Sequence, residues 1–327
     1  YMRRHFVHFL WGTLLAILGF TSLFFISVWN GWIGYMPDMD ELSNPIDKFA
    51  SQVYASDQKL IGTWNQDNNN RIAIDYNGLS PHLVHALVAT EDERFYEHSG
   101  IDFIALGRAI IKRGVMRQAS AGGGSTITQQ LAKQLFSEKA HSTMERLLQK
   151  PIEWIIAVKL ERHFTKEEIL AMYFNYFDFL HNAVGIKRAA NVYFNKEPRN
   201  LNVTEAALLV GLCKNPSMFN PLRYPERCRQ RRNVVLMQMV KSGYVTKDEY
   251  EELSQRPLGI HFTKAKPVDG AADYFQAFLR QYMMANKPER KNYQTWQNRQ
   301  FVLDSIAWEQ DPLYGWCNKN LKRNGEP

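Results

Sequence analysis

The stretch EDERFYEHSG, from Glu91 to Gly100, concentrates four carboxylates, an arginine and a histidine in ten residues. It follows an apolar segment, Leu83–Val88, that Ser80-Pro81 introduces with a helix N-cap and a proline at the first helical position. We therefore predict a buried helix that ends at Glu91. A carboxylate beside a packed core borders low dielectric, which suits it to accept a proton. A solvated charged turn after a core helix is the alternative interpretation.

A glycine-rich motif, GGGSTITQQ, follows at Gly122–Gln130. The spacing Thr126-x-x-Gln129 has the form of a capping box and predicts that a helix begins there. The N-terminus of that helix would present free backbone N–H groups to an anion such as a pyrophosphate. The alternative is an ordinary glycine-rich surface loop.

In this order and spacing, EDxxFxxHxG and GGSTITQQ resemble the peptidoglycan glycosyltransferases of glycosyltransferase family 51. These domains are the polymerising half of class A penicillin-binding proteins. The resemblance runs from about Pro81 to Pro257 and includes three further motifs, at Lys150–Glu161, Lys166–Asn175 and Arg231–Leu236. The chain departs from the family at Ile152, where relatives often carry a basic residue, and in the loop 179–185, which keeps only one of the usual glycines, Gly185.

The resemblance implies a mainly α, lysozyme-like glycosyltransferase domain that polymerises lipid II. In that reaction a sugar 4-hydroxyl attacks an anomeric carbon with inversion, and undecaprenyl pyrophosphate leaves. A sugar hydroxyl needs a base to remove its proton, and Glu91 is our candidate. The leaving group is a stable anion that needs positive charge more than a strong acid.

The remaining site residues are expected from the same motifs. Glu153, in a helix that we predict from Pro151 to Glu161, is a second catalytic candidate that would position a metal or an acceptor group. Mg²⁺ or Mn²⁺ bridging the phosphates is the only cofactor that we expect. The expected substrate-binding residues are Asp92, Arg94, Phe95, His98, Ser125, Thr126, Gln129, Gln130, Lys133, Arg146 and Lys150. Of these, Asp92, Arg94 and His98 are expected to orient Glu91, and Lys133, Lys150 and Arg146 to meet the phosphates.

The segment from Phe6 to Val28 is apolar, carries no charge apart from a possible one on His8, and is long enough to cross a bilayer as a helix. The short apolar core and cleavage site of a signal peptide are not evident. Two arginines precede the segment and three acidic residues follow it, which predicts a cytoplasmic N-terminus and an extracytoplasmic location for the rest of the chain. Together with the resemblance, this implies a single-pass protein of the bacterial inner membrane with a periplasmic or extracytoplasmic catalytic domain. Two tryptophans, Trp29 and Trp32, would lie at the outer interface.

We predict five regions: a cytoplasmic tail (1–5), a transmembrane helix (6–30), a linker with a β-hairpin (31–76), the glycosyltransferase domain (77–257) and the start of a truncated transpeptidase region (258–327). Within 51–75 we expect strands around two turns, the last strand at Arg71–Ile74. Ser56-x-x-Lys59 matches an acyl-enzyme signature, but the serine falls in a turn and the chain has no K-T-G. We therefore expect no transpeptidase activity.

Other classes of function remain possible at this point. A net charge of +7 over 327 residues suits a phosphate-bearing partner or an anionic membrane. Nucleic acid is disfavoured, because no nucleic-acid module or dense basic run is present. Paired glutamates also suit a lysozyme-like hydrolase or lytic transglycosylase, and a cell-wall scaffold without activity is the third class. The expected partners are lipid II, the growing glycan chain, the bilayer and proteins of a cell-wall synthesis complex.

Overall fold

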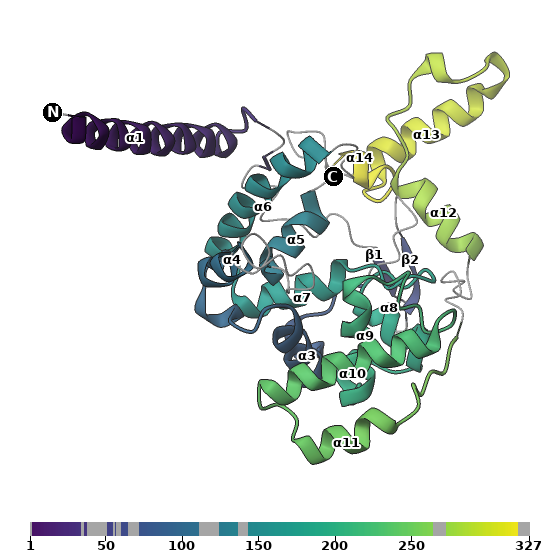
Figure 1. Cartoon of the computed structure of the whole chain (residues 1–327). Coiled ribbons are helices and arrows are strands. Elements are labelled where there is room, and N and C mark those ends of the chain that lie inside the picture. Colours follow the sequence, from purple (N-terminus) through teal and green to yellow (C-terminus); the bar gives the residue numbers. More distant parts are fainter. Residues whose placement is uncertain are drawn as a thin grey trace. The chain divides into compact units, whose positions relative to one another are not determined.

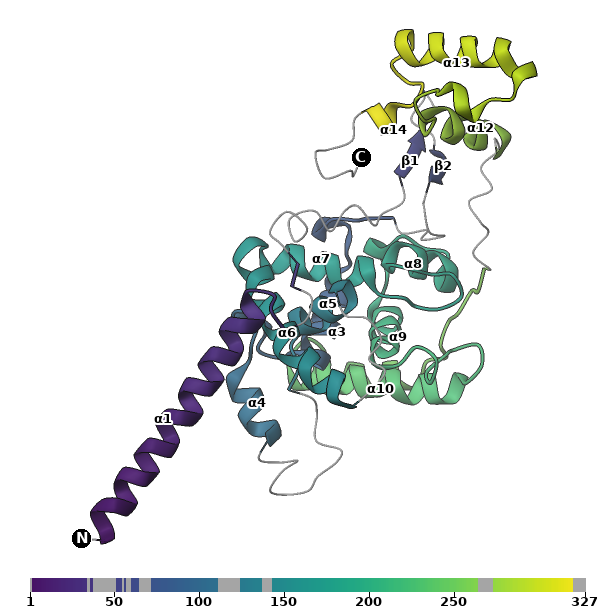
Figure 2. The ribbon, with the colours of Figure 1, turned by 90° about the horizontal axis from the view of Figure 1, so that it is seen from above.

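The computed structural model describes residues 2–33, 36–37, 51–54, 56, 60–64, 72–110, 124–136, 143–263 and 273–319. The chain divides into two compact units, which Figures 1 and 2 show in two views. One unit consists of Tyr1–Phe49 and Asn69–Ala265, and the other of Ala50–Asn68 and Lys266–Pro327. The described part is mainly helical, with an N-terminal apolar helix and a two-stranded sheet, which confirms the predicted fold class. The predicted limits of the five regions stay a prediction.

The first unit contains the helices that build the candidate site. Its α-helices are α1 (Met2–Trp29), α3 (Pro81–Glu91), α4 (Phe103–Ile110), α5 (Ile127–Phe136), α6 (Thr143–His163), α7 (Lys166–Tyr176), α8 (Ile186–Phe194), α9 (Val203–Lys214), α10 (Pro225–Lys241) and α11 (Lys247–Gln255). Short 3₁₀ helices lie at η2 (Tyr76–Gly78), η3 (Phe95–Glu97) and η5 (Pro198–Asn200).

Helix α3 lies at the centre of this unit and packs against both α9 and α10. Six of its residues are buried, among them Leu83 and Leu87, which are fully enclosed. Burying a leucine side chain contributes about 1.5–3 kcal/mol, so several such residues fix the helix firmly. Helices α5, α6 and α7 form the neighbouring part of the core. Glu91, the last residue of α3, is therefore presented by a rigid element.

Side-chain caps begin several of these helices, including the predicted start of α3. Ser80 caps α3 by accepting the His82 N–H, and Pro81 occupies the first turn. Complete capping boxes begin α7, α9 and α11. At α5 only half of the predicted box forms. The Thr126 hydroxyl accepts the Gln129 N–H at 3.1 Å, but the Gln129 side chain turns to the carbonyl oxygen of Gly100.

Helix α6 corrects one prediction. It begins at Thr143 and continues through Pro151, where we expected it to start. A proline removes one backbone hydrogen bond and crowds the preceding turn, but α6 stays continuous while it packs along α5. Glu153 therefore lies inside the helix and not in its first turn, so attraction to a helix N-terminus does not explain this carboxylate.

The N-terminal helix α1 has the properties of a membrane span by length and composition. The stretch His5–Trp29 has a mean hydropathy of 2.1, and none of its most apolar window is buried in the protein. Near its C-terminal end, Phe25 stacks on Trp154 of α6 with ring centroids 6.5 Å apart. Lys159, also on α6, lies 5.1 Å from the centroid of the Trp29 ring. These contacts connect the apolar helix to the helix that carries Glu153.

The predicted third strand is absent from the described residues 72–75. Asn175 takes the place of a partner strand, because its amide accepts the Ile74 N–H at 3.2 Å and donates to the Ile74 carbonyl at 2.8 Å. An amide side chain can thus form the backbone hydrogen bonds that a neighbouring strand would otherwise provide. The contact also attaches this segment to α7.

The second unit contains the predicted hairpin. Strands β1 (Ser51–Tyr54) and β2 (Leu60–Trp64) pair antiparallel, with Ser51 opposite Trp64 and an irregularity between Val53 and Tyr54. The same unit contains helix α12 (Asp273–Met283). The remaining elements were not predicted: η6 (Arg290–Asn292), η7 (Thr295–Gln297), α13 (Asn298–Gln310) and α14 (Trp316–Lys319).

Candidate active site

The site is built around the turn that follows α3. Asp92 is 7% exposed and ends the helix, donating its N–H to the Val88 carbonyl. Its carboxylate lies 3.0 Å from Nε2 of His98 and accepts the Ile127 N–H at 3.0 Å. Asp92 therefore joins the end of α3, the following turn and the positively polarised N-terminus of α5. A carboxylate with these partners fixes the shape of the turn.

A second ion pair holds the other side of the turn. Arg94 pairs with Asp102, and the Asp102 carboxylate also accepts the Ala105 N–H at 2.8 Å in the first turn of α4. Burial works to raise the pKa of Asp102, but the Ala105 N–H and the Arg94 guanidinium outweigh it and hold that pKa below its usual value. Arg94 is thus engaged in structure, as is Phe95, which is fully buried.

Glu91 is held by donors from two distant helices. Gln130 of α5 donates its Nε2 to one carboxylate oxygen at 3.0 Å, and Nη2 of Arg231 in α10 lies 3.4 Å from the other. The Glu91 side chain is 17% exposed and that of Arg231 is 9% exposed. Burial lowers the pKa of Arg231 and the Glu91 charge opposes that shift. The carboxylate is therefore oriented by the protein while part of it stays accessible.

The entry to α5 packs closely on α6 through Gly100. This residue has φ +92°, and its carbonyl accepts bonds from the Thr126 hydroxyl at 2.7 Å and from Gln129 at 3.2 Å. A Cβ at position 100 would lie 2.9 Å from the carbonyl carbon of Ala157. Only glycine satisfies both the conformation and the space. Thr126 and Gln129, expected to bind substrate, are buried and make structural contacts.

Glu153 is buried and paired. Lys150, one turn earlier on α6, donates to Oε2 of Glu153 at 2.7 Å and lies 3.4 Å from the Ser125 hydroxyl. The Glu153 side chain is 3% exposed, whereas that of Lys150 is 48% exposed. The pair therefore places a cation at the surface beside Ser125, with a buried carboxylate behind it.

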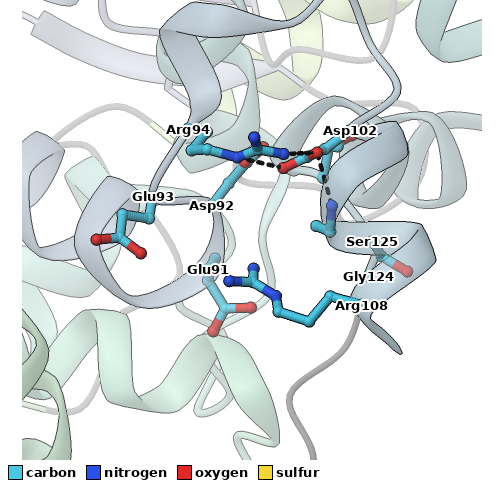
Figure 3. Close-up of a pocket in the computed structure, with 10 residues that line it drawn as sticks. Glu91, Asp92, Glu93, Arg94, Asp102, Arg108, Gly124 and Ser125 are labelled. Carbon is cyan, nitrogen blue, oxygen red and sulfur yellow. Dashed lines mark hydrogen bonds and ion pairs between the residues drawn. The ribbon is translucent and has the colours of Figure 1, made fainter. Parts of the chain in front are cut away.

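A small cavity of about 50 Å³ lies beside the turn that follows α3, and Figure 3 shows the residues that line it. Glu91 and Ser125 both line it, as do Asp92, Glu93, Arg94, Asp102, Ala105, Arg108, Gly124 and Thr126. Arg108 projects from α4 back towards Glu91 (Figure 3) and is exposed. The structure thus brings residues of the two sequence motifs to one cavity, with the Glu91 carboxylate and the Arg108 guanidinium both on its wall.

Arg108 and Arg231 are the residues that the sequence-based interpretation did not assign to the site. Arg231 belongs to the last family motif, Arg231–Leu236, but the motif does not indicate that Arg231 contacts Glu91. Lys133 is exposed on α5, and the side chain of Arg146 lies outside the described residues. The predicted role of each site residue stays a prediction.

The metal prediction also stays open. Among the described residues, no group of three or more His, Cys, Asp or Glu side chains is arranged to hold a metal ion. Glu153, the expected ligand, has Lys150 as its partner. The protein side chains alone therefore do not form a cation site in the described part, and a bridging ion would have to take most of its ligands from phosphates and water.

The two departures from the family pattern have local structural consequences. Ile152 packs partly buried against the core, so this position offers no positive charge. In the loop 179–185, Leu180, His181 and Asn182 all have positive φ, at 66°, 52° and 62°. An isolated bridge pairs Asp178 with Val184 and closes the loop. The turn therefore keeps a left-handed backbone with side chains that favour it less than glycine does.

Comparison with known proteins identifies the family. The family model described as Transglycosylase matches residues 57–240, which is more than half of the chain. The chain belongs to the transglycosylase family. This confirms the resemblance drawn from the motifs. Relatives include Penicillin-binding protein 1A of Aquifex aeolicus (38% identical over 276 residues), Penicillin-binding protein 1A of Escherichia coli (36% over 248 residues) and Penicillin-binding protein 1F of Bacillus subtilis (33% over 267 residues).

These alignments cover 83%, 76% and 82% of this chain, but only 36%, 28% and 35% of the respective relatives. The chain thus spans about a third of the length of the curated relatives that it matches. A crystal structure of Penicillin-binding protein 1A from Haemophilus influenzae matches with a TM-score of 0.37 and 24% identity, covering 75% of this chain and 26% of that one. That similarity is too low to support a structural argument.

Proposed function

We propose that this protein is a peptidoglycan glycosyltransferase that polymerises lipid II into glycan strands, with Glu91 as the general base. The observation that carries the proposal is the setting of Glu91. It ends a rigid helix, is oriented by Gln130 and Arg231, and lines a cavity shared with Ser125 of the second motif. Membership of the transglycosylase family supports the same reaction class.

In this proposal Glu91 removes the proton from the 4-hydroxyl of one sugar as that oxygen attacks the anomeric carbon of the other. General-base catalysis contributes about 10²–10⁴-fold in rate. The anomeric configuration inverts from α to β, and undecaprenyl pyrophosphate carries away the bonding electrons as an anion. Asp92, Arg94 and His98 keep the turn in shape and do not react.

The leaving pyrophosphate requires fixed positive charge. Arg108, which lines the cavity, and the exposed end of Lys150, which lies beside Ser125, are proposed to supply it, whereas Arg94 on the same wall is paired with Asp102. Lys133 and Arg146 remain proposed phosphate contacts on the strength of the motifs. A Mg²⁺ or Mn²⁺ ion, when bound, would supply further positive charge to the phosphates, and Glu153 is the carboxylate that we propose would help to hold it.

A membrane location fits this chemistry, because both substrates would be tethered to a bilayer by polyprenyl tails. We propose that α1 anchors the protein in the bacterial cytoplasmic membrane as a single span, with the N-terminus in the cytoplasm and the catalytic unit in the periplasm. Helix α1 is long and apolar enough to cross a membrane. Trp29 and Trp32 are exposed at and just after its C-terminal end, where an interfacial aromatic belt would lie. Both observations support this arrangement. Partner proteins of a cell-wall synthesis complex are part of the same proposal.

The choice between a polymerase and a lytic enzyme is tested by product. The detergent-solubilised chain is incubated in parallel with lipid II and with preformed peptidoglycan, and the products are separated by length. A polymerase gives long glycan chains from the first and nothing from the second. Release of fragments from preformed peptidoglycan would support the lytic alternative, and no product from either would support the scaffold.

A further inference from the structure

A chain of hydrogen bonds runs from Glu91 into the core. Gln130 donates its Nε2 to Oε2 of Glu91 at 3.0 Å. The hydroxyl of Tyr173, on α7, donates to Oε1 of the same Gln130 at 3.1 Å. Three helices, α3, α5 and α7, therefore contribute one residue each to a hydrogen-bond chain that ends at the Glu91 carboxylate. Arg231 holds the opposite oxygen of Glu91 from α10.

The Glu91 carboxylate decides which end of the Gln130 amide faces it, because an ionised carboxylate only accepts hydrogen bonds. A primary amide has a donor end and an acceptor end of almost the same shape. If Gln130 were turned over, its carbonyl oxygen would face the Glu91 carboxylate, and two acceptors would oppose each other. With the NH₂ end of Gln130 at Glu91, the Tyr173 hydroxyl donates to the carbonyl end at 3.1 Å and so holds the amide in place from behind.

Tyr173 is suited to remain a donor. Its side chain is fully enclosed, and burial, followed by the nearby Cys213 thiol and the Glu91 charge, raises its pKa well above the usual value. Burial thus favours the protonated phenol, which is the form that donates to Gln130. Because the bonds of a buried hydrogen-bond chain strengthen one another, removal of one member weakens the bonds that remain.

We propose that Tyr173 is a positioning residue for Glu91, acting through the Gln130 amide without touching substrate. The inference rests on the proposed function, because it assigns Tyr173 to the same proton-abstracting step. Removal of the hydroxyl frees the amide to rotate and leaves Glu91 less well oriented as a base. Substrate binding is unaffected, since the hydroxyl lies behind Gln130 and away from the cavity lining.

The test is Tyr173→Phe, measured as kcat and KM for lipid II polymerisation. Loss of one buried hydrogen bond to an oriented group predicts a fall in kcat of about tenfold with KM unchanged. The matched control is Tyr193→Phe, another fully buried tyrosine, whose hydroxyl donates to the Phe179 carbonyl at 2.6 Å. The control loses a comparable bond and should keep the wild-type kcat.

A double-mutant cycle separates positioning from general destabilisation. In a Gln130→Leu background the amide is gone, so adding Tyr173→Phe should lower kcat no further. Additive effects, a rise in KM, or equal kcat values for Tyr173→Phe and the control would overturn the proposal. If Tyr173→Phe did not fold, Gln130→Met alone should lower kcat at unchanged KM, and a change confined to KM would overturn it. A wild-type chain that makes no polymer would instead contradict the proposed function.

Discussion

Replacing Glu91 by glutamine tests the assignment of the general base. The amide keeps the shape of the side chain but cannot accept a proton from a sugar hydroxyl. Loss of general-base catalysis is worth about 10²–10⁴-fold in rate, or about 3–5 kcal/mol in the activation barrier. We therefore expect polymerisation by Glu91→Gln to fall by at least a hundredfold.

The structure also predicts the effect of this substitution on stability. Both partners of Glu91 are donors, Gln130 at 3.0 Å and Arg231 at 3.4 Å. A glutamine at position 91 has one acceptor oxygen and one NH₂ group, so it can satisfy only one of the two. Leaving the other donor unpaired costs about 1–3 kcal/mol, which lowers Tm by about 2–12 °C in a domain of this size. The variant should therefore fold.

The assay compares initial rates of glycan-chain formation from lipid II by the wild type, Glu91→Gln and Glu97→Gln. Glu97 is an exposed carboxylate in the same turn and serves as the control, with a rate close to that of the wild type. Folding of each variant is checked by thermal denaturation. A folded Glu91→Gln protein that polymerises within tenfold of the wild type would refute the role of Glu91.

Four other predictions concern groups elsewhere in the unit or chain. Glu153→Gln should impair turnover while the protein stays folded, and a change in Tm with normal polymerisation would mean that Glu153 is only structural. Gly100→Ala should cost at least about 1–3 kcal/mol in the free energy of unfolding, because φ is +92° and a Cβ would meet the α6 backbone; Gly107→Ala, which meets nothing within 4 Å, should not. The pKa of Asp102 is lowered in the folded protein, so its contribution to stability should be present near pH 7 and lost as the pH falls below about 4; an Asp102→Asn variant with the same acid denaturation curve as the wild type would contradict this. No covalent adduct with a fluorescent penicillin is expected, and a labelled band that disappears in Ser56→Ala would show that the turn match is functional.

Local features of the structure could be predicted from the sequence because they depend on neighbouring residues. Ser80 and Pro81 mark the start of α3, and the capping box of Thr165 and Glu168 marks the start of α7. The hairpin and the apolar α1 follow from short patterns in the same way. The start of α6 could not be predicted, because a proline that usually begins a helix lies within one here. The expected third strand failed because Asn175, a hundred residues away in sequence, satisfies the Ile74 backbone.

In the candidate site, too, local motifs could be recognised in the sequence but contacts between distant residues could not. The motifs indicated Glu91 and Ser125, but not what holds them. Gln130 and Arg231 reach Glu91 from 39 and 140 residues away in the sequence, and no local pattern encodes such pairs. Arg108 carried no signal of its own, since it is one arginine on a short amphipathic helix. The sequence motifs thus indicated the candidate residues, while the packing of α3, α5, α7 and α10 determined which side chains contact Glu91.

The most direct test of the central claim couples the two products of the reaction. Purified wild-type chain in detergent is given lipid II, and released undecaprenyl pyrophosphate is counted against the disaccharide units joined into polymer. The proposed mechanism predicts one pyrophosphate for each new β-linkage. Polymer without equivalent pyrophosphate release, or pyrophosphate released with free disaccharide as the only sugar product, would contradict it.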